Sequence, residues 1–262
     1  MRTLTIAISA SLLGFALPFS PSAPVNVNDL MKIHSSTISQ LKIDPRTAPK
    51  PDDTGITDLF YLRHILEFDV GQEEDDEGAL NLLGSVQKTL SWRRGAGRSI
   101  CAAAASAIAS ATSSGSGWDN GPVVANAPHS DKISTYLTGD NVITTTDSSG
   151  DLVYCIRAGQ INDKDLMAKV TVEEMSDFFL YAKEVNTAVA DKRSMETGKL
   201  CRICTANDLS GVNLFGDASF RKALSMSSTK ASEVYPAISA ETFLLNLPTV
   251  RATKTQSRTP NG

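Results

Sequence analysis

Residues 200–211 read LCRICTANDLSG, and the first six, Leu200–Thr205, have the length and apolar composition of a β-strand. Two further strands are predicted, Leu152–Arg157 (LVYCIR) after a turn and Thr242–Leu247 (TFLLNL). The last is apolar on both faces, which is typical of a sheet covered by helices. Helical patterns separate the strands, and this alternation predicts an α/β fold.

Both intervening helices begin with a recognisable cap. Residues 171–174 (TVEE) form a capping box, in which the hydroxyl and the carboxylate satisfy free backbone N–H groups. Asp217 can cap the second helix. The first helix presents one apolar face, which consists of Met175, Phe178, Phe179, Ala182, Val185 and Val189.

In the N-terminal half of the chain, the sequence patterns predict helices and no strands. Apolar residues recur at helical spacing between positions 59 and 66 and again from Leu80 to Trp92. The acidic run at 73–77 lacks the alternating ligands and central glycine of a calcium loop, so we interpret it as a solvated start to the second helix. The alanine-rich residues 101–111 predict a third helix.

The first fifty residues resemble a targeting leader. Arg2 precedes the apolar stretch Leu4–Leu17, which is too short for a transmembrane helix, and prolines follow it. We predict a signal peptide over 1–22 and entry into the secretory pathway; a buried N-terminal helix is the alternative. Residues 23–50, rich in Ser, Pro and Thr, resemble the second part of the leaders that direct proteins into complex plastids. If the protein is not imported into a plastid, we expect it to be secreted or to stay in the endomembrane system.

These patterns divide the chain into segments. We expect a helical N-terminal module over 51–112, a flexible linker at Ser113–Gly117 and an α/β domain over 118–248. The tail, 249–262, has no apolar periodicity and is expected to be disordered.

Composition and motifs exclude several functional classes. The net charge of −4 argues against nucleic acid as a partner. The three histidines are scattered, and neither a P-loop nor a nucleophile elbow is present. Gly95-Ala96-Gly97 begins a dinucleotide-type pattern but follows a helix and lacks a third small residue at Ile100. We therefore expect a non-catalytic protein without metal or cofactor.

Cys201-Arg202-Ile203-Cys204 is the one motif that suggests redox chemistry. A redox or zinc C-x-x-C usually lies in a turn or at a helix start, where the two thiolates converge. In a strand, positions three apart point to opposite faces. We therefore interpret both cysteines as structural, and a thiol redox protein is the alternative.

Three motifs in the C-terminal half resemble the CRAL-TRIO family of lipid-transfer proteins. They are an Asp-Leu-x-Gly turn at 208–211, Tyr235-Pro236, and an apolar strand that ends in Asn246-Leu247-Pro248. Upstream, residues 62–70 and 79–93 resemble the family's N-terminal helical module, and residues 153–174 also fit. Together the resemblance covers most of residues 56–248.

The resemblance implies a mixed sheet that forms the floor of an apolar pocket, with helices covering it. Such a pocket binds a lipid or another apolar small molecule without covalent chemistry, and transfer involves transient contact with a membrane surface. By position, the resemblance indicates Thr205, Leu245 and Leu247 as lipid-binding residues. A buried methylene contributes about 0.8 kcal/mol, so an acyl chain alone gives substantial affinity.

The chain departs from the family pattern in two respects. Members that recognise phosphatidylinositol carry a glutamate after Tyr-Pro, where this chain has Ala237, and their partner lysine follows Asn-x-Pro. The family also continues with a gate helix and another strand, so we expect a C-terminally incomplete domain. The alternative function is a degenerate module for protein or membrane-surface binding, suggested by Arg93, Arg94 and Arg98 beside Trp92.

Overall fold

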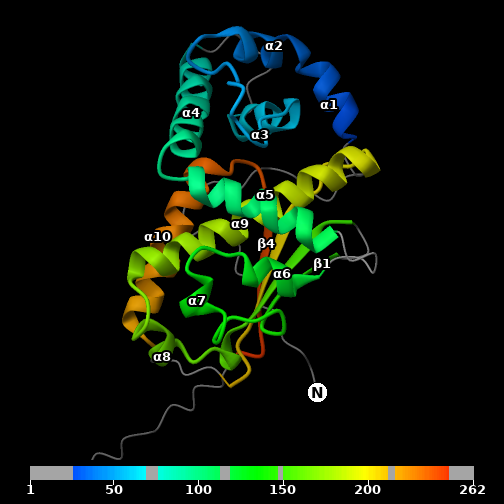
Figure 1. Cartoon of the computed structure of the whole chain (residues 1–262). Coiled ribbons are helices and arrows are strands. Elements are labelled where there is room, and N and C mark those ends of the chain that lie inside the picture. Colours follow the sequence, from blue (N-terminus) through cyan, green and yellow to red (C-terminus); the bar gives the residue numbers. More distant parts are fainter. Residues whose placement is uncertain (1–25, 69–75, 113–118, 147–149, 212–215, 248–262) are drawn as a thin grey trace, which may run out of the picture.

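The computed structural model describes residues 26–68, 76–112, 119–146, 150–211 and 216–247 (Figure 1). Within these ranges a helical module stands at one end of a sheet that is packed with further helices. The module consists of α1 (Val27–Ile33), α2 (Ser35–Ile43), α3 (Asp58–Phe68) and α4 (Asp76–Arg94). The remaining elements are α5 (Arg98–Thr112), α6 (Asn120–Ala125), α7 (Ser130–Ile133), β1 (Val142–Thr146), β2 (Leu152–Arg157), η1 (Ala158–Gln160), α8 (Asp163–Met167), α9 (Val172–Thr197), β3 (Ile203–Asp208), α10 (Ala218–Val234) and β4 (Ser239–Leu245).

The described strands form one open mixed sheet in the order β1-β2-β3-β4. β1 is antiparallel to β2, whereas β2, β3 and β4 are mutually parallel. Helix α9 connects β2 to β3, and α10 connects β3 to β4. Both crossovers move the same way across the sheet, and such crossovers are right-handed, so the two helices pack on the same face. The predicted mixed α/β architecture is therefore confirmed.

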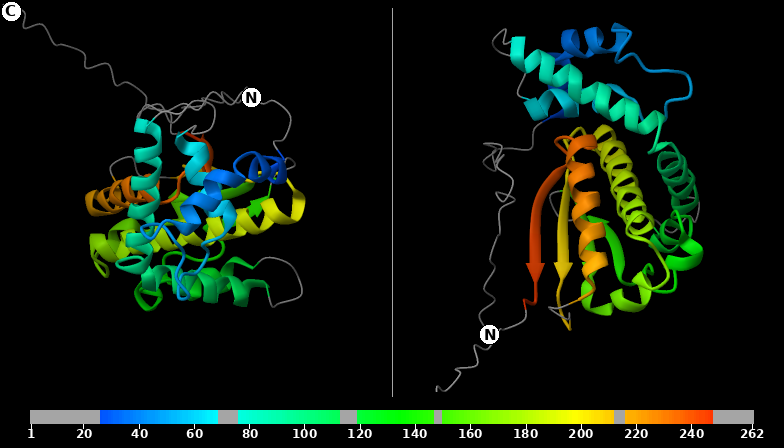
Figure 2. Two further views of the ribbon diagram at one scale, coloured as in Figure 1. Left: turned by 90° about the horizontal axis from the view of Figure 1, so that it is seen from above. Right: turned by 90° about the vertical axis from the view of Figure 1, so that its left-hand side faces the viewer.

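Helices cover only one face of this sheet. Figure 2 shows α5, α9 and α10 together on one side of the strands, with no helix of the described ranges on the other side. The buried cluster beneath these helices joins Leu152 and Ile203 of the strands to Phe178 and Tyr181 of α9. The sequence predicted a sheet covered by helices, and the described helices cover one of its two faces.

The helical module begins earlier than the sequence predicted. Helices α1 and α2 lie within 23–50, the segment expected to be a leader, and both pack against α3. Val27, Ile38 and Leu41 are buried in the same cluster as Leu62. The backbone N–H of Val27 also donates to the carbonyl of Gly198 at 2.9 Å. The serines that suggested a leader lie on the exposed side of α2, so composition concealed an amphipathic pattern.

Helix α5 was expected in the helical module but belongs to the α/β part. Ile100, Ala104 and Ala107 are buried in the cluster of the sheet, because small side chains let α5 approach α9 closely. The turn between α4 and α5 contains Gly95-Ala96-Gly97, and packing explains the second of these glycines. A Cβ on Gly97 would lie 2.5 Å from the Trp92 indole, so packing requires glycine there.

Element boundaries agree in part with expectation. The capping box of Thr171 and the cap of Asp217 are both present, and β2 has the predicted bounds. Strands β3 and β4 are displaced by two or three residues from the predicted ranges. Strand β1 was missed, because three of the five residues in its sequence VITTT are threonines and only two are apolar. The predicted signal peptide, the linker, residues 73–75 and the tail lie outside the described residues.

Candidate functional site

The register of the strands assigns each side chain to one of two faces. Leu152 and Tyr154 of β2 pack against the core beneath the helices, so Val153 and Cys155 belong to the opposite face. Residues paired across neighbouring strands share a face. The face without described helices, called the open face below, therefore consists of Ile143, Thr145, Val153, Cys155, Arg157, Cys204, Ala206, Asp208, Phe243 and Leu245.

The open face is apolar over most of its area. Thr145, Arg157 and Asp208 interrupt it, and Arg157 and Asp208 are register partners at the carboxyl ends of β2 and β3. Glu241, which is exposed and lies two residues before Phe243 on β4, belongs to the same side by strand alternation. None of its apolar residues belongs to either buried cluster of the described chain. All of them except Ala206 are half-buried or exposed, and Leu245 is 42% exposed. Contiguous apolar surface of this kind usually marks a site of interaction.

The three predicted lipid-binding residues do not converge. Leu245 lies on the open face, and Leu247, which follows the end of β4, is 44% exposed. Thr205 pairs with Tyr154 and Thr242, so it belongs to the helix-covered face. Sequence reasoning did not single out Val153 and Phe243, which also belong to the open face. Strand alternation is the signal that could have found them, once the covered face was known.

Two of the quoted motifs meet at the carboxyl ends of β3 and β4. The Asp208 carboxylate accepts hydrogen bonds from Asn246 Nδ2 at 2.9 Å and from the N–H of Ser210 at 3.0 Å. The bond from Asn246 is the main reason why the pKa of Asp208 lies below its usual range. Asn246 has a φ of 53° and Gly211 a φ of 75°, a region that these residue types tolerate best. The Asp-Leu-x-Gly turn and the Asn-x-Pro strand end are therefore one local structure.

None of the four cysteines forms a disulfide bond, and they lie in two environments. Cys101 and Cys201 are buried, whereas Cys155 and Cys204 are half-buried on the open face. The Cys201-x-x-Cys204 pair is thus divided between the core and the opposite face of the sheet. This arrangement agrees with the structural interpretation of the motif.

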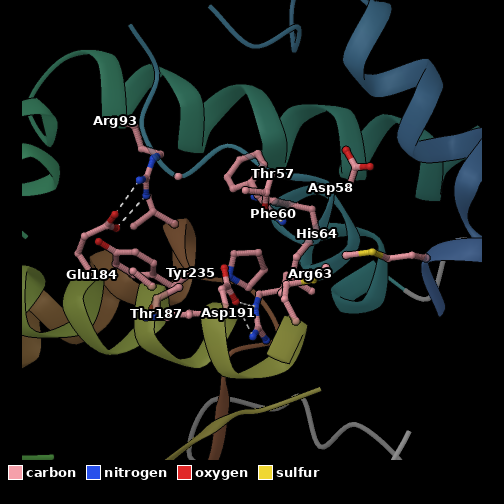
Figure 3. Close-up of a pocket in the computed structure, with 18 residues that line it drawn as sticks. Thr57, Asp58, Phe60, Arg63, His64, Arg93, Glu184, Thr187, Asp191 and Tyr235 are labelled. Atoms are coloured by element: carbon pink, nitrogen blue, oxygen red, sulfur yellow. Dashed lines mark hydrogen bonds and ion pairs between the residues drawn. The ribbon is translucent and has the colours of Figure 1, made fainter. Parts of the chain in front are cut away.

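A separate cavity of about 520 Å³ lies where the helical module meets α9 (Figure 3). Below we call it the interface cavity. Its walls come from α1, α3 and α4, from α9, and from the segment that ends α10. Its apolar wall consists of Met31, Leu59, Phe60, Ala188, Val234 and Pro236. Such a volume is typical of small-molecule sites.

Two ion pairs cross the interface at this cavity. Arg93 donates to both oxygens of Glu184, at 2.6 and 2.8 Å, and both side chains are at most one-tenth exposed. The Arg63 guanidinium lies 2.7 Å from the Asp191 carboxylate. Burial alone would lower the pKa of Arg93, but the Glu184 carboxylate raises it above the usual range. Burial raises the pKa of Asp191, and Arg63 partly offsets that effect.

The arginines beside Trp92 do not form a free basic patch. Arg93 is paired with Glu184, and Arg94 Nη2 lies 2.6 Å from Asp53. Three arginines suggested a membrane- or protein-binding module. Of these, only Arg98 is exposed, and Arg93 and Arg94 are partly buried. This removes most of the support for that alternative.

Two polar atoms on the wall of the interface cavity are buried without a hydrogen bond. They are His64 Nε2 and the Tyr235 hydroxyl. Burial lowers the pKa of His64 to about 3, so its ring is neutral at pH 7. Burial and the neighbouring Glu184 raise the pKa of Tyr235 well above its usual value. Tyr235 was noted in the sequence as part of a family motif, whereas His64 carried no signal.

Comparisons with known proteins leave the family a proposal. A scan against protein-family models finds no match, and a search of curated proteins finds none either. In the part of the chain that the structure describes, no helix combines the length and hydropathy needed to cross a membrane. Within the same ranges, no cluster of three or more acidic, histidine or cysteine side chains is arranged to hold a metal ion.

Proposed function

We propose that this chain binds a lipid or another apolar small molecule on the open face of its sheet, as a CRAL-TRIO-like, non-catalytic carrier. The observation that carries the proposal is the contiguous apolar surface of four strands, which no described helix covers. Residues of two of the three quoted family motifs lie at the edge of this surface. Asp208 and Asn246 join the strands at its carboxyl edge.

The open face suits an elongated amphiphile. Val153 and Cys204 lie side by side near its centre, and Phe243 and Leu245 extend the floor across β4. An acyl chain laid along this floor would remove methylenes from water at about 0.8 kcal/mol each. Arg157 and Asp208 lie at one end of the floor and can meet the polar group of the ligand. No bond is made or broken in such binding.

Native mass spectrometry of the full chain after exposure to a mixed lipid extract tests the proposal. A stoichiometric adduct, identified after release, is expected. A chain that stays without adduct at every lipid concentration would contradict a carrier function.

The native cysteines locate the ligand. With bound lipid, Cys155 and Cys204 should react more slowly with a maleimide, because both lie on the open face. Cys101 and Cys201 are buried and serve as internal controls. An adduct that leaves the labelling rates of Cys155 and Cys204 unchanged would place the ligand elsewhere.

A charged substitution gives an independent test. Leu245→Lys should lower lipid affinity by about tenfold, because 1.4 kcal/mol corresponds to a factor of ten and a buried leucine contributes more than that. Leu80→Lys is the matched control, since Leu80 is 68% exposed on α4 in the helical module. Equal lipid binding by the two variants would rule out the open face.

A further inference from the structure

The interface cavity has a wall in which every charge is already compensated. The charged side chains that line it are Asp58, Arg63, Arg93, Glu184, Asp191 and Lys192. Arg63 pairs with Asp191 and Arg93 with Glu184 across the wall itself. Asp58 pairs with Lys42, and Lys192 lies 3.9 Å from Glu196. An ionic ligand would therefore find no spare counter-charge, and burying it would carry a large desolvation cost.

The same wall offers hydrogen-bonding capacity that the protein does not use. Four buried side-chain polar atoms among the described residues have no hydrogen-bond partner, and two belong to this wall, His64 Nε2 and the Tyr235 hydroxyl. Both residues are more than nine-tenths buried. Leaving such a group unsatisfied costs about 1–3 kcal/mol. A ligand that bonds to either group would recover part of this cost.

The cavity is also accessible and of suitable size. Asp58, Lys192 and Met195 are at least half exposed, so they form its mouth. Its volume of about 520 Å³ can hold a molecule of one or two rings or a short chain. Figure 3 shows Arg63, Arg93 and Tyr235 around the space between α3 and α9.

We propose that the interface cavity binds a small, uncharged, mainly apolar molecule with at least one hydroxyl or carbonyl group that bonds to Tyr235. The site is distinct from the open face of the sheet. It joins residues of the helical module to residues of α9, so occupancy stabilises the contact between the two parts. This inference does not depend on the carrier function.

The test compares two probes of similar shape, 2-naphthol and 2-naphthoate, at pH 7 on the full chain by isothermal titration calorimetry. We expect saturable, one-to-one binding of 2-naphthol and at least tenfold weaker binding of the anionic 2-naphthoate. Equal affinities would overturn the argument from compensated charges. Absence of saturable 2-naphthol binding would overturn the site.

Two variants localise the probe. Ala188→Phe fills the cavity and should abolish 2-naphthol binding, whereas Ala105→Phe, on an exposed position of α5, should leave it unchanged. Leu245→Lys should also leave it unchanged, which separates this site from the open face. Unchanged binding by Ala188→Phe would overturn the proposal.

Tyr235→Phe keeps the test decisive if Ala188→Phe does not fold. It removes only a hydroxyl that makes no hydrogen bond of normal geometry, although Glu184 is close enough to raise its pKa, so the thermal midpoint should change little. Affinity for 2-naphthol should fall by about threefold to tenfold, the equivalent of one neutral hydrogen bond. Unchanged affinity would show that the hydroxyl does not contact the probe and would overturn the assigned role of Tyr235.

Discussion

His64 is a buried polar residue at the contact between the helical module and the α/β part, and its surroundings decide its protonation state. His64 is fully buried between Phe60, which packs against it edge to face, and Ser85, whose hydroxyl lies 3.0 Å from Nδ1. Among the described residues, burial is the only influence that shifts the pKa of this ring, and no carboxylate there holds it charged. A histidine in such surroundings must be neutral in the folded state, although it is protonated in the unfolded chain below pH 6.5.

This difference makes stability depend on pH. The pKa of His64 is lowered to about 3, so its contribution is complete above pH 6.5 and is lost progressively as the pH falls towards 3. Between pH 7 and pH 5 the loss should be about 2 kcal/mol of unfolding free energy. His64→Gln removes the titrating ring. In urea denaturation, the unfolding free energy of this variant should therefore fall by about 2 kcal/mol less than that of the wild type between pH 7 and pH 5. Identical pH dependence in His64→Gln and the wild type would contradict the burial of a neutral ring.

At the scale of elements, α2 decides whether residues 26–43 belong to the folded protein. Leu41 is 6% exposed and Ile43 is 78% exposed on the same helix, so they form a matched pair. Leu41→Ala should lower the unfolding free energy by about 2–4 kcal/mol, and Ile43→Ala should change it by less than about 0.5 kcal/mol. Chemical denaturation of both variants measures this. If Leu41→Ala were as mild as Ile43→Ala, α2 would behave as a detachable leader.

The same elements show where sequence reasoning succeeded and failed. Thr171 and Asp217 marked helix starts correctly, because a cap is a local interaction that the sequence displays in full. Helix α2 was missed because its apolar side chains are spaced among serines, and its stability comes from packing on α3. Thr205 and Leu245 were grouped by their positions in the family resemblance. Their separation onto two faces depends on register, which no short motif records.

At the scale of the whole molecule, two buried clusters meet at one polar interface. One cluster belongs to α1–α4 and the other to the sheet with its helices. Arg63 of α3 crosses between them and is 3% exposed. It donates to Asp191, to the carbonyl of Cys201 at 2.9 Å and to that of Ala237 at 3.0 Å. A single side chain thus holds α3 against α9, the start of β3 and the segment before β4.

Arg63 should therefore couple the unfolding of the two clusters. Arg63→Met leaves Asp191 buried without its partner, and the loss of unfolding free energy should be about 3–5 kcal/mol. Arg46→Met, which removes an exposed pair with Asp44, should change the unfolding free energy little, because solvent screens that pair. In a Trp118→Phe background, which leaves Trp92 as the only tryptophan, fluorescence and far-ultraviolet circular dichroism should give one transition with Arg63 intact and separate midpoints in Arg63→Met. The double variant Arg63→Met/Asp191→Leu should recover much of the unfolding free energy that Arg63→Met loses, because no buried charge then remains without a partner. A double variant as unstable as the single one would show that the bonds to Cys201 and Ala237, and not the ion pair, join the two clusters.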